Sequence, residues 1–420
     1  MNYKSLTGVR DVLPDEQPYW TTIEKKINEI THLYGYQRVE PPILEETALF
    51  IRGVGDTTDI VEKEMYSFID KGDNYVTMRP EFTAGFMRLY LEHGMHKLPK
   101  PVKLYTMGPI FRYEKPQAGR FRQHTQFNVE AIGEQDPALD LEVMSIAWQL
   151  YAELGFKGLK FQLNSTGCPV CRPAYIEKLH RYYRQYSETI CHDCKRRLER
   201  NALRLLDCKK EQCQPVIARA PVISEHLCQE CDEHFAALKS YLTLTTRPYE
   251  VNHRLVRGLD YYTKTVFEVW AQGIGAQSAM CGGGRYDGLI EQLGGEPTPG
   301  IGFGSGIERI IMSMKEQGIA PTPIPSPPVY IAHFGETARN TAIKLTFSLR
   351  EHQMGAIMSF GSKSIKAMMR HAHRSNARFV LLVGEDEVER NVVAVKDMQS
   401  GEQTDVPIDD VFIFLTEHLN

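Results

Sequence analysis

The sequence contains no long hydrophobic run. Nowhere in its 420 residues does a stretch approach the ~18 consecutive apolar residues of a membrane helix. Residues 1–8 have neither an apolar core nor a small-residue cleavage site, so they lack the pattern of a secretory signal peptide. We therefore expect a cytoplasmic protein that does not contact a membrane.

The sequence also lacks an excess of either sign of charge. Lys and Arg number 49 and Asp and Glu number 53, which gives a formal net charge of −4. This balance excludes a protein that binds nucleic acid through a basic surface over the whole chain, but it does not exclude a local basic surface. The composition, 42% hydrophobic and 24% charged, is that of an ordinary globular protein. The length predicts two to three domains.

Two common nucleotide-binding patterns are missing. Residues 361–364 contain Gly-Ser-Lys-Ser, but the spacing fails the P-loop pattern. Residues 300–306 are rich in glycine and precede a helical pattern, yet they do not fit the dinucleotide-binding fingerprint. No ribose-binding acid follows them at the usual distance. A nucleotide, if bound, must be held by other groups.

Proline is concentrated at residues 321–328, where five of eight residues are proline, and this predicts a stiff linker. Residues 329–420 alternate strand-like and helical stretches, which predicts a small α/β domain. Residues 1–167 and 249–320 hold many short β-rich runs with few helices between them. This predicts an α+β core whose antiparallel sheet is flanked by helices. Residues 168–248 look like a helical, cysteine-rich, basic insertion, with 14 Lys and Arg against 10 Asp and Glu.

Three arginines lie beside glycine or at the end of an expected element. Arg112 follows an apolar strand, Arg257 precedes a glycine, and Arg309 begins a helix after a glycine-rich run. A guanidinium group is planar and permanently charged, so three of them converging on one point suit a polyphosphate. Without a P-loop lysine, an arginine clamp with Mg²⁺ is a natural way to hold ATP. Any one of the three, taken alone, could instead cap a helix or pair with a surface acid.

These arginines fall in stretches that resemble the motifs of class II aminoacyl-tRNA synthetases. Residues 111–127 resemble motif 2, with Phe-Arg-x-Glu, a long loop and a returning strand. Residues 302–309 resemble motif 3, and residues 34–45 resemble motif 1 with its helix, strand and terminal proline. These three motifs indicate only the class.

Two longer stretches resemble the signature peptides of the histidine–tRNA ligase family of bacterial type. They are residues 257–268, RGLDYYTKTVFE, and residues 282–289, GGGRYDGL. Residues 79–84 resemble that family's amino-acid-binding strand. The resemblance covers essentially the whole chain. It implies a class II synthetase-like sheet in the core and an anticodon-binding domain at 329–420.

The resemblance implies a ligase that uses ATP and Mg²⁺ to attach L-histidine to histidine tRNA through a histidyl-adenylate. Arg112 would bind the α-phosphate and the amino acid carboxylate, and Arg309 would hold the triphosphate. Arg257 would stabilise the charge that develops at the α-phosphate. Glu114 would join Arg112 and Arg309 in the ATP site. Because motif 1 builds a two-fold interface in this class, a homodimer is implied.

The same resemblance assigns a histidine pocket. Glu81 and Thr83 would bind the α-amino end of the substrate. Glu130 and Tyr262 would each bond one ring nitrogen of the imidazole, and such a site rejects analogues that leave its polar groups unpaired. The implied histidine-binding residues are Glu81, Thr83, Arg112, Gln126, Glu130, Arg257, Tyr261 and Tyr262.

Local geometry adds competing expectations. Tyr261 and Tyr262, adjacent on a strand, would face opposite sides, so one of them is expected in the core. Phe82, at a position more often occupied by glycine in bacterial relatives, would lie on a strand and point away from the pocket. Glu81 could instead cap a helix, and Glu130 could be a satisfied edge carboxylate.

Eight of the nine cysteines lie between residues 168 and 231. Three pairs have the CxxC spacing of a zinc half-site, and the pair at 208 and 213 is looser. Two such pairs about 20 residues apart fit a structural Cys₄ site. The family resemblance argues against zinc, because zinc is not part of the family's chemistry. Reduced free thiols and disulfides are therefore the alternative interpretations of these cysteines. The candidate zinc ligands are Cys168, Cys171, Cys191 and Cys194.

Five cations recur at a helical spacing in the C-terminal domain, with no acid among them. Five like charges on one face repel one another and favour an anionic partner, here the anticodon stem, over a merely solvated face. The positive balance of the insertion likewise suits an RNA backbone. The candidate tRNA-binding residues are Lys363, Lys366, Arg370, Arg374 and Arg378.

Two other functions compete with the enzyme. One is a non-catalytic regulatory subunit of ATP phosphoribosyltransferase in histidine biosynthesis, which shares the fold. Such relatives typically lose the catalytic arginines and the anticodon-binding domain, whereas this sequence keeps both. The other is a zinc-stabilised RNA-binding module, which leaves Glu81, Glu130 and Tyr262 unexplained.

Overall fold

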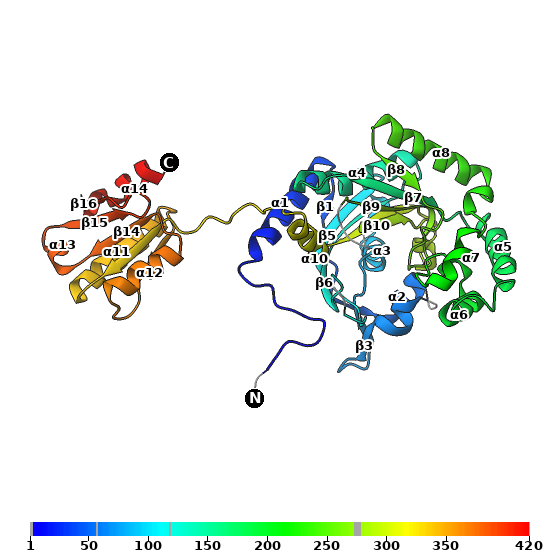
Figure 1. Cartoon of the computed structure of the whole chain (residues 1–420), viewed down its shortest axis with the longest axis horizontal. Coiled ribbons are helices and arrows are strands. Elements are labelled where there is room, and N and C mark those ends of the chain that lie inside the picture. Colours follow the sequence, from blue (N-terminus) through cyan, green and yellow to red (C-terminus); the bar gives the residue numbers. More distant parts are fainter. Residues whose placement is uncertain (1–2, 56–57, 117–118, 273–278, 420) are drawn as a thin grey trace. The chain divides into compact units, whose positions relative to one another are not determined.

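The computed structural model describes residues 3–55, 58–116, 119–272 and 279–419. The chain forms two compact units, Met1–Thr322 and Pro323–Asn420 (Figure 1). Among the described residues, no helix is both long enough and apolar enough to span a membrane. The division of the first unit into a core and an insertion stays a prediction.

The first unit combines helices with one eight-stranded sheet and one three-stranded sheet. Its helices are α1 (Gln17–Leu33), α2 (Thr47–Val54), α3 (Thr83–Glu92), α4 (Pro137–Leu154), α5 (Arg172–Arg184), α6 (His192–Arg200), α7 (Gln214–Ala218), α8 (Gln229–Leu244), α9 (Leu289–Gln292) and α10 (Ile307–Glu316). Its strands are β1 (Gln37–Arg38), β2 (Leu44–Glu46), β3 (Tyr66–Ile69), β4 (Tyr75–Met78), β5 (Val102–Phe111), β6 (Gln123–Ile132), β7 (Lys160–Ser165), β8 (Tyr249–Val251), β9 (Thr263–Trp270), β10 (Ala279–Arg285) and β11 (Gly300–Gly306).

The large sheet has the order β1-β5-β6-β11-β10-β9-β7-β8. Its six central strands, β5 to β7 in this order, pair with one another antiparallel, and the short strands β1 and β8 each add a parallel pair at an edge. Strands β5 and β6 are the pair predicted on either side of the motif 2 loop. Residues 117–118 of that loop lie outside the described residues.

Alternation along β6 separates the core from the opposite face of the sheet. Phe127 and Val129 are buried in the main apolar core, which the sheet forms with α1, α4, α8 and α10. Because successive side chains of a strand point to opposite faces, the residues between them face the other way. On that second face a smaller core contains residues of α3, α9 and the segment before β9.

The second unit is a mixed five-stranded sheet, ordered β13-β12-β14-β15-β16. Strands β13, β12 and β14 are parallel, and β15 and β16 continue antiparallel. Its strands are β12 (Val329–His333), β13 (Ala356–Met358), β14 (Phe379–Val383), β15 (Val392–Asp397) and β16 (Gln403–Pro407). Its helices are α11 (Glu336–Glu351), α12 (Ile365–Arg374), α13 (Glu385–Glu389) and α14 (Val411–Leu419).

The predicted fold class is confirmed: an α+β protein with a largely antiparallel sheet flanked by helices and a C-terminal α/β domain. The hydrophobic pattern of the sequence does not reveal strand β16. Only Val406 of its five residues is buried, so this edge strand carries no hydrophobic alternation.

Candidate active site

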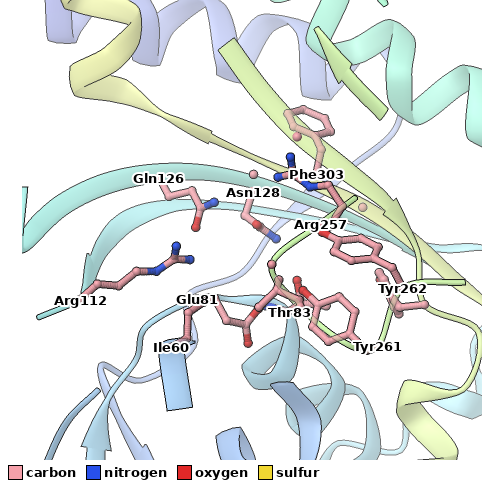
Figure 2. A pocket seen from close by; sticks show the side chains of 16 residues that line it. Ile60, Glu81, Thr83, Arg112, Gln126, Asn128, Arg257, Tyr261, Tyr262 and Phe303 are labelled. Carbon is pink, nitrogen blue, oxygen red and sulfur yellow. The ribbon is translucent and has the colours of Figure 1, made fainter. Parts of the chain in front are cut away.

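Two adjoining cavities open on the face of the sheet away from the main core, and Figure 2 shows the inner one. The inner cavity measures about 170 Å³ and the outer about 430 Å³. Arg112 and Arg257 line both cavities, and Arg309 lines the outer one. Three arginines that are far apart in the sequence therefore converge around one cleft.

Each of these arginines is held in place by a hydrogen bond. Arg112 Nε donates to the carbonyl of Pro80 at 2.8 Å. Arg257 Nη1 donates to Glu268 Oε1 at 2.5 Å, and Arg309 Nη1 donates to the carbonyl of Ala279 at 3.0 Å. Anchored guanidinium groups of this kind form a preorganised site for an anion.

Several cations of the outer cavity lie close enough to affect one another's pKa, although acids also line this cavity. Burial, together with the positive charges of Arg112 and Arg309, lowers the pKa of His124 to about 4. Burial and the charge of Arg120 lower the pKa of Arg309 itself. Cations that repel one another in a partly buried cleft favour a polyanionic ligand. Glu114 also lines this cavity and lies 3.6 Å from Arg120.

Glu81 lies two residues before α3 and not on a strand, so the strand expected for residues 79–84 is wrong. Its carboxylate accepts hydrogen bonds from the backbone N–H groups of Thr83 and Ala84, at 2.7 and 2.8 Å. It therefore caps the helix while it also lines the inner cavity. Phe82, 1% exposed, packs under the Arg79 guanidinium at 4.4 Å.

Gln126 and Asn128 project from β6 into the inner cavity (Figure 2). Gln126 Oε1 is buried and has no hydrogen-bond partner among the described residues. Most buried acceptors are satisfied, so an orphaned one in a cavity wall indicates a ligand that brings a donor. Together with the Glu81 carboxylate, this oxygen suits an ammonium group.

Glu130 lies behind the wall of the inner cavity. Its side chain is fully buried and accepts hydrogen bonds from Thr83 Oγ1 at 2.7 Å, Asn128 Nδ2 at 2.8 Å and the Tyr286 hydroxyl. Burial raises the pKa of Glu130 to about 7, although the three hydrogen bonds act to lower it. Glu130 thus fixes three residues that do line the cavity. Its direct contact with an imidazole stays a prediction.

Tyr261 and Tyr262 both line the inner cavity, with ring centroids 4.8 Å apart (Figure 2). Both are also buried in the smaller core, so the expectation that one of them is a core residue is confirmed, whereas the expectation that they face opposite sides is wrong. Both residues precede β9, where the chain turns, so the alternation of a pleated strand does not apply to them.

Glycines on β11 make room for this site. A Cβ at Gly302 would lie 1.9 Å from Glu130 Oε2, and one at Gly304 would lie 1.8 Å from Gln126 Nε2. Both contacts are far too short, so the polar side chains of β6 require bare backbone on the neighbouring strand.

Sequence reasoning missed three residues of the site. Asn128 shares a face with Gln126 and Glu130, so period-two alternation along β6 could have found it. Tyr286 and Glu268 lie inside the two signature peptides, but their roles depend on long-range contacts with Glu130 and with Arg257. No local pattern reports such contacts.

The basic residues of the C-terminal unit do not form one stripe. Helix α12 carries Lys366, Arg370 and Arg374, all exposed, while Lys363 precedes the helix. Arg378 lies beyond the helix, and its guanidinium binds Asp397 at 2.7 Å. The predicted stripe is therefore wrong at its C-terminal end, because an acid on β15 neutralises Arg378.

The cysteines form two clusters. Cys168 and Cys171 do not meet Cys191 and Cys194, so the expected pairing of these four residues in one site is wrong. The clusters are Cys168, Cys171, Cys228 and Cys231, and Cys191, Cys194, Cys208 and Cys213. All nine cysteines are free thiols, which excludes disulfides in this structure.

An antiparallel sheet that carries an arginine-lined cleft between motifs 2 and 3, without a P-loop, defines a class II aminoacyl-tRNA synthetase. The family description "Histidyl-tRNA synthetase" matches residues 8–310, and "Anticodon binding domain" matches residues 328–418. The chain belongs to the histidyl-tRNA synthetase family.

Similar proteins cover nearly the whole chain. A histidine–tRNA ligase of Dehalococcoides mccartyi is 51% identical over 97% of this chain and 98% of its own length. One from Desulforamulus reducens is 47% identical over 97% of each. The crystal structure of the S. aureus histidyl-tRNA synthetase has a TM-score of 0.83 at 35% identity, and covers 98% of this chain and 99% of its own.

Proposed function

We propose that this chain activates L-histidine with MgATP and transfers the histidyl group to histidine tRNA. The observation that carries this proposal is the meeting of Arg112, Arg257 and Arg309 around one cleft beside a polar inner cavity. In the proposal the inner cavity takes histidine, the outer cavity takes the triphosphate, and the reaction occurs where the two join.

In the first step the histidine carboxylate attacks the α-phosphate of ATP. A carboxyl oxygen–phosphorus bond forms and the bond to pyrophosphate breaks. Arg112 and Arg257 line both cavities, so both lie where negative charge builds up in the transition state. Arg309 and Glu114 belong to the outer cavity, where Arg309 holds the triphosphate that Mg²⁺ accompanies. The protein works by positioning and electrostatic stabilisation.

In the second step the terminal ribose hydroxyl of the tRNA attacks the acyl carbon, and AMP leaves. The substrate's ammonium group sits against Glu81 and the unpaired Gln126 Oε1 in this account. The imidazole ring faces Tyr261 and Tyr262. Glu130 holds Thr83, Asn128 and Tyr286 in position through the hydrogen bonds that it accepts from them. A bound imidazole could replace one of these three donors and then donate to the Glu130 carboxylate directly.

The tRNA partner is proposed to contact the C-terminal unit. This unit matches the anticodon-binding domain, and Lys366, Arg370 and Arg374 form an exposed basic face on α12.

A homodimer and a cytoplasmic location complete the proposal. Both are supported by membership of the family.

Histidine-dependent exchange of pyrophosphate into ATP, measured without tRNA, tests this function. Robust exchange is expected. Absence of exchange in folded protein would favour a regulatory subunit or an RNA-binding module. A structure titled "ATP phosphoribosyltransferase regulatory subunit/histidyl-tRNA synthetase", from Bacillus halodurans, has a TM-score of 0.62 at 21% identity, and this likeness concerns the fold alone.

A further inference from the structure

Two groups of four cysteines lie within residues 168–231, outside the proposed active site. In each group the four sulfur atoms all lie within 4.8 Å of one another. Seven of these eight residues are buried, and Cys228 is intermediate. We propose that each group binds one structural zinc ion, so that the chain carries two Cys₄ zinc centres.

The sulfur–sulfur distances fit tetrahedral coordination. In the first cluster, Cys168 Sγ lies 3.7 Å from the sulfurs of both Cys171 and Cys228, and Cys171 Sγ lies 3.9 Å from that of Cys231. Zinc holds thiolates at ~2.3 Å, which places the corners of a tetrahedron about 3.8 Å apart. A disulfide would need sulfurs at ~2.05 Å.

The second cluster has similar sulfur–sulfur distances. Cys191 Sγ lies 3.9 Å from Cys208 Sγ, and Cys213 Sγ lies 3.9 Å from Cys194 Sγ. An iron–sulfur cluster would hold its cysteines around a larger inorganic core, whereas these sulfurs share one small sphere. Four thiolates around a single ion, in an enzyme whose proposed reaction involves no electron transfer, favour zinc.

The backbone around the sulfurs is arranged as in zinc knuckles. Each CxxC pair stands at the beginning of a helix, at the start of α5, α6 or α8. The Cys168 N–H points at Cys171 Sγ at 3.3 Å, and the Cys191 N–H points at Cys213 Sγ at 3.2 Å. Such N–H···S bonds offset the negative charge that remains on a zinc tetrathiolate.

The first centre is joined to the segment that lines the histidine cavity. Arg172, next to Cys171, donates to the carbonyl of Tyr262 and, from Nε, to the carbonyl of Thr166 at 2.9 Å. Lys264 Nζ binds Glu230, which lies between Cys228 and Cys231, at 2.7 Å. Lys264 has a φ of +47°, a conformation that needs support from its surroundings.

The second centre is joined to the other end of the same segment. Helix α6 starts at this centre, and just beyond its end Asn201 Nδ2 donates to Asp260 Oδ1 at 3.0 Å. Arg204 Nη2 donates to the carbonyl of Gly258 at 2.8 Å. Residues next to the two centres therefore hold the segment 258–264 in position by contacts at both of its ends. This positioning role rests on the proposed function, whereas the metal assignment does not.

Metal analysis of the full chain, purified with a thiol reductant and without chelator, tests the assignment. We expect two zinc ions per chain and no iron. Cys168→Ser with Cys171→Ser should retain one zinc, and so should Cys191→Ser with Cys194→Ser. Cys281→Ser, at the ninth cysteine, should retain two. Any other zinc content of the unaltered chain, or iron in place of zinc, overturns the proposal.

A second measurement covers variants that fail to fold. Replacement of the bound metal by Co²⁺ in the unaltered chain should give the intense visible bands of tetrahedral cobalt thiolate, saturating at two equivalents. No thiolate band, or saturation at one equivalent, overturns the two-centre assignment whatever the variants do.

The positioning role is tested separately by pyrophosphate exchange. In the folded variant lacking Cys191 and Cys194, the KM for histidine should rise about tenfold or more while the KM for ATP changes less than about threefold. Unchanged values for both substrates, with one zinc lost, would overturn the positioning role and leave the metal assignment standing.

Discussion

Arg257 and Glu268 form an ion pair at the wall between the two cavities, with Arg257 Nη1 2.5 Å from Glu268 Oε1. Glu268 Oε2 accepts a second hydrogen bond, from Trp270 Nε1 at 2.8 Å. The carboxylate is thus fixed to the sheet, and it fixes the guanidinium in turn. A cation held this firmly stabilises charge without reorganising during the reaction.

Arg257→Ala should therefore fold normally and lose histidyl-adenylate formation by more than ~100-fold, the scale of a lost preorganised charge stabiliser. Pyrophosphate exchange measures the loss, and circular dichroism checks the fold. Arg254→Ala, an exposed arginine three residues away that lines neither cavity, is the matched control. Near-normal exchange by Arg257→Ala would refute its role.

Gly304→Ala should disturb the histidine site selectively. The new Cβ would meet Gln126 Nε2 at 1.8 Å and push that side chain out of place. We expect the KM for histidine to rise about tenfold, the cost of a misplaced binding group. Gly288→Ala, where an added Cβ meets nothing within 4 Å, should behave like the unaltered enzyme. Equal behaviour of the two variants would contradict the assignment of Gln126.

The raised pKa of Glu130 predicts that the free energy of unfolding depends on pH. Its pKa in the folded chain, raised to about 7 by burial, lies above the model-peptide range near 4.3 expected when unfolded. Between these values the folded state holds a proton that the unfolded state has lost, so this residue lowers the free energy of unfolding as pH rises. Its contribution reaches about 1.4 kcal/mol per pH unit.

Denaturant unfolding of the unaltered chain and of Glu130→Gln, between pH 5 and 7, measures this contribution. The variant should lose less stability over the same interval, because it has no carboxyl group to ionise. Parallel curves for the two proteins would show that Glu130 titrates near its ordinary value.

The three exposed cations of α12 should serve tRNA binding and not adenylate formation. Replacing Lys366, Arg370 and Arg374 by Gln should lower kcat/KM for tRNA about tenfold or more and weaken its salt dependence, because fewer phosphates are neutralised. Pyrophosphate exchange should be unchanged. Arg378→Gln, which breaks an ion pair with Asp397, should affect Tm more than tRNA charging. Undiminished charging by the triple variant would remove α12 from the interface.

Much of the fold could be predicted from the sequence, because local patterns encode it. The apolar strand expected before Arg112 is β5, and the alternating stretches of residues 329–420 form the expected α/β unit. The motif peptides also identified the three arginines that the fold brings together. Alternation within a strand or helix is a property of neighbouring residues and needs no knowledge of the rest of the chain.

The errors concern contacts between distant segments or turns with special geometry. The grouping of eight cysteines into two clusters depends on which helices meet, and spacing alone cannot decide that. Glu81 and Tyr261 were assigned to strands, but one caps a helix and the other precedes a strand. The neutralisation of Arg378 by Asp397 joins two elements that no local pattern connects.

The central claim is that one nucleotide lies among Arg112, Arg257 and Arg309, beside a cavity for the imidazole. A crystal structure of the chain with a non-hydrolysable histidyl-adenylate analogue tests it most directly. The account predicts the imidazole beside Tyr261 and Tyr262, and the phosphate between Arg112 and Arg257. An analogue bound elsewhere, or one whose phosphate touches none of the three arginines, would contradict it.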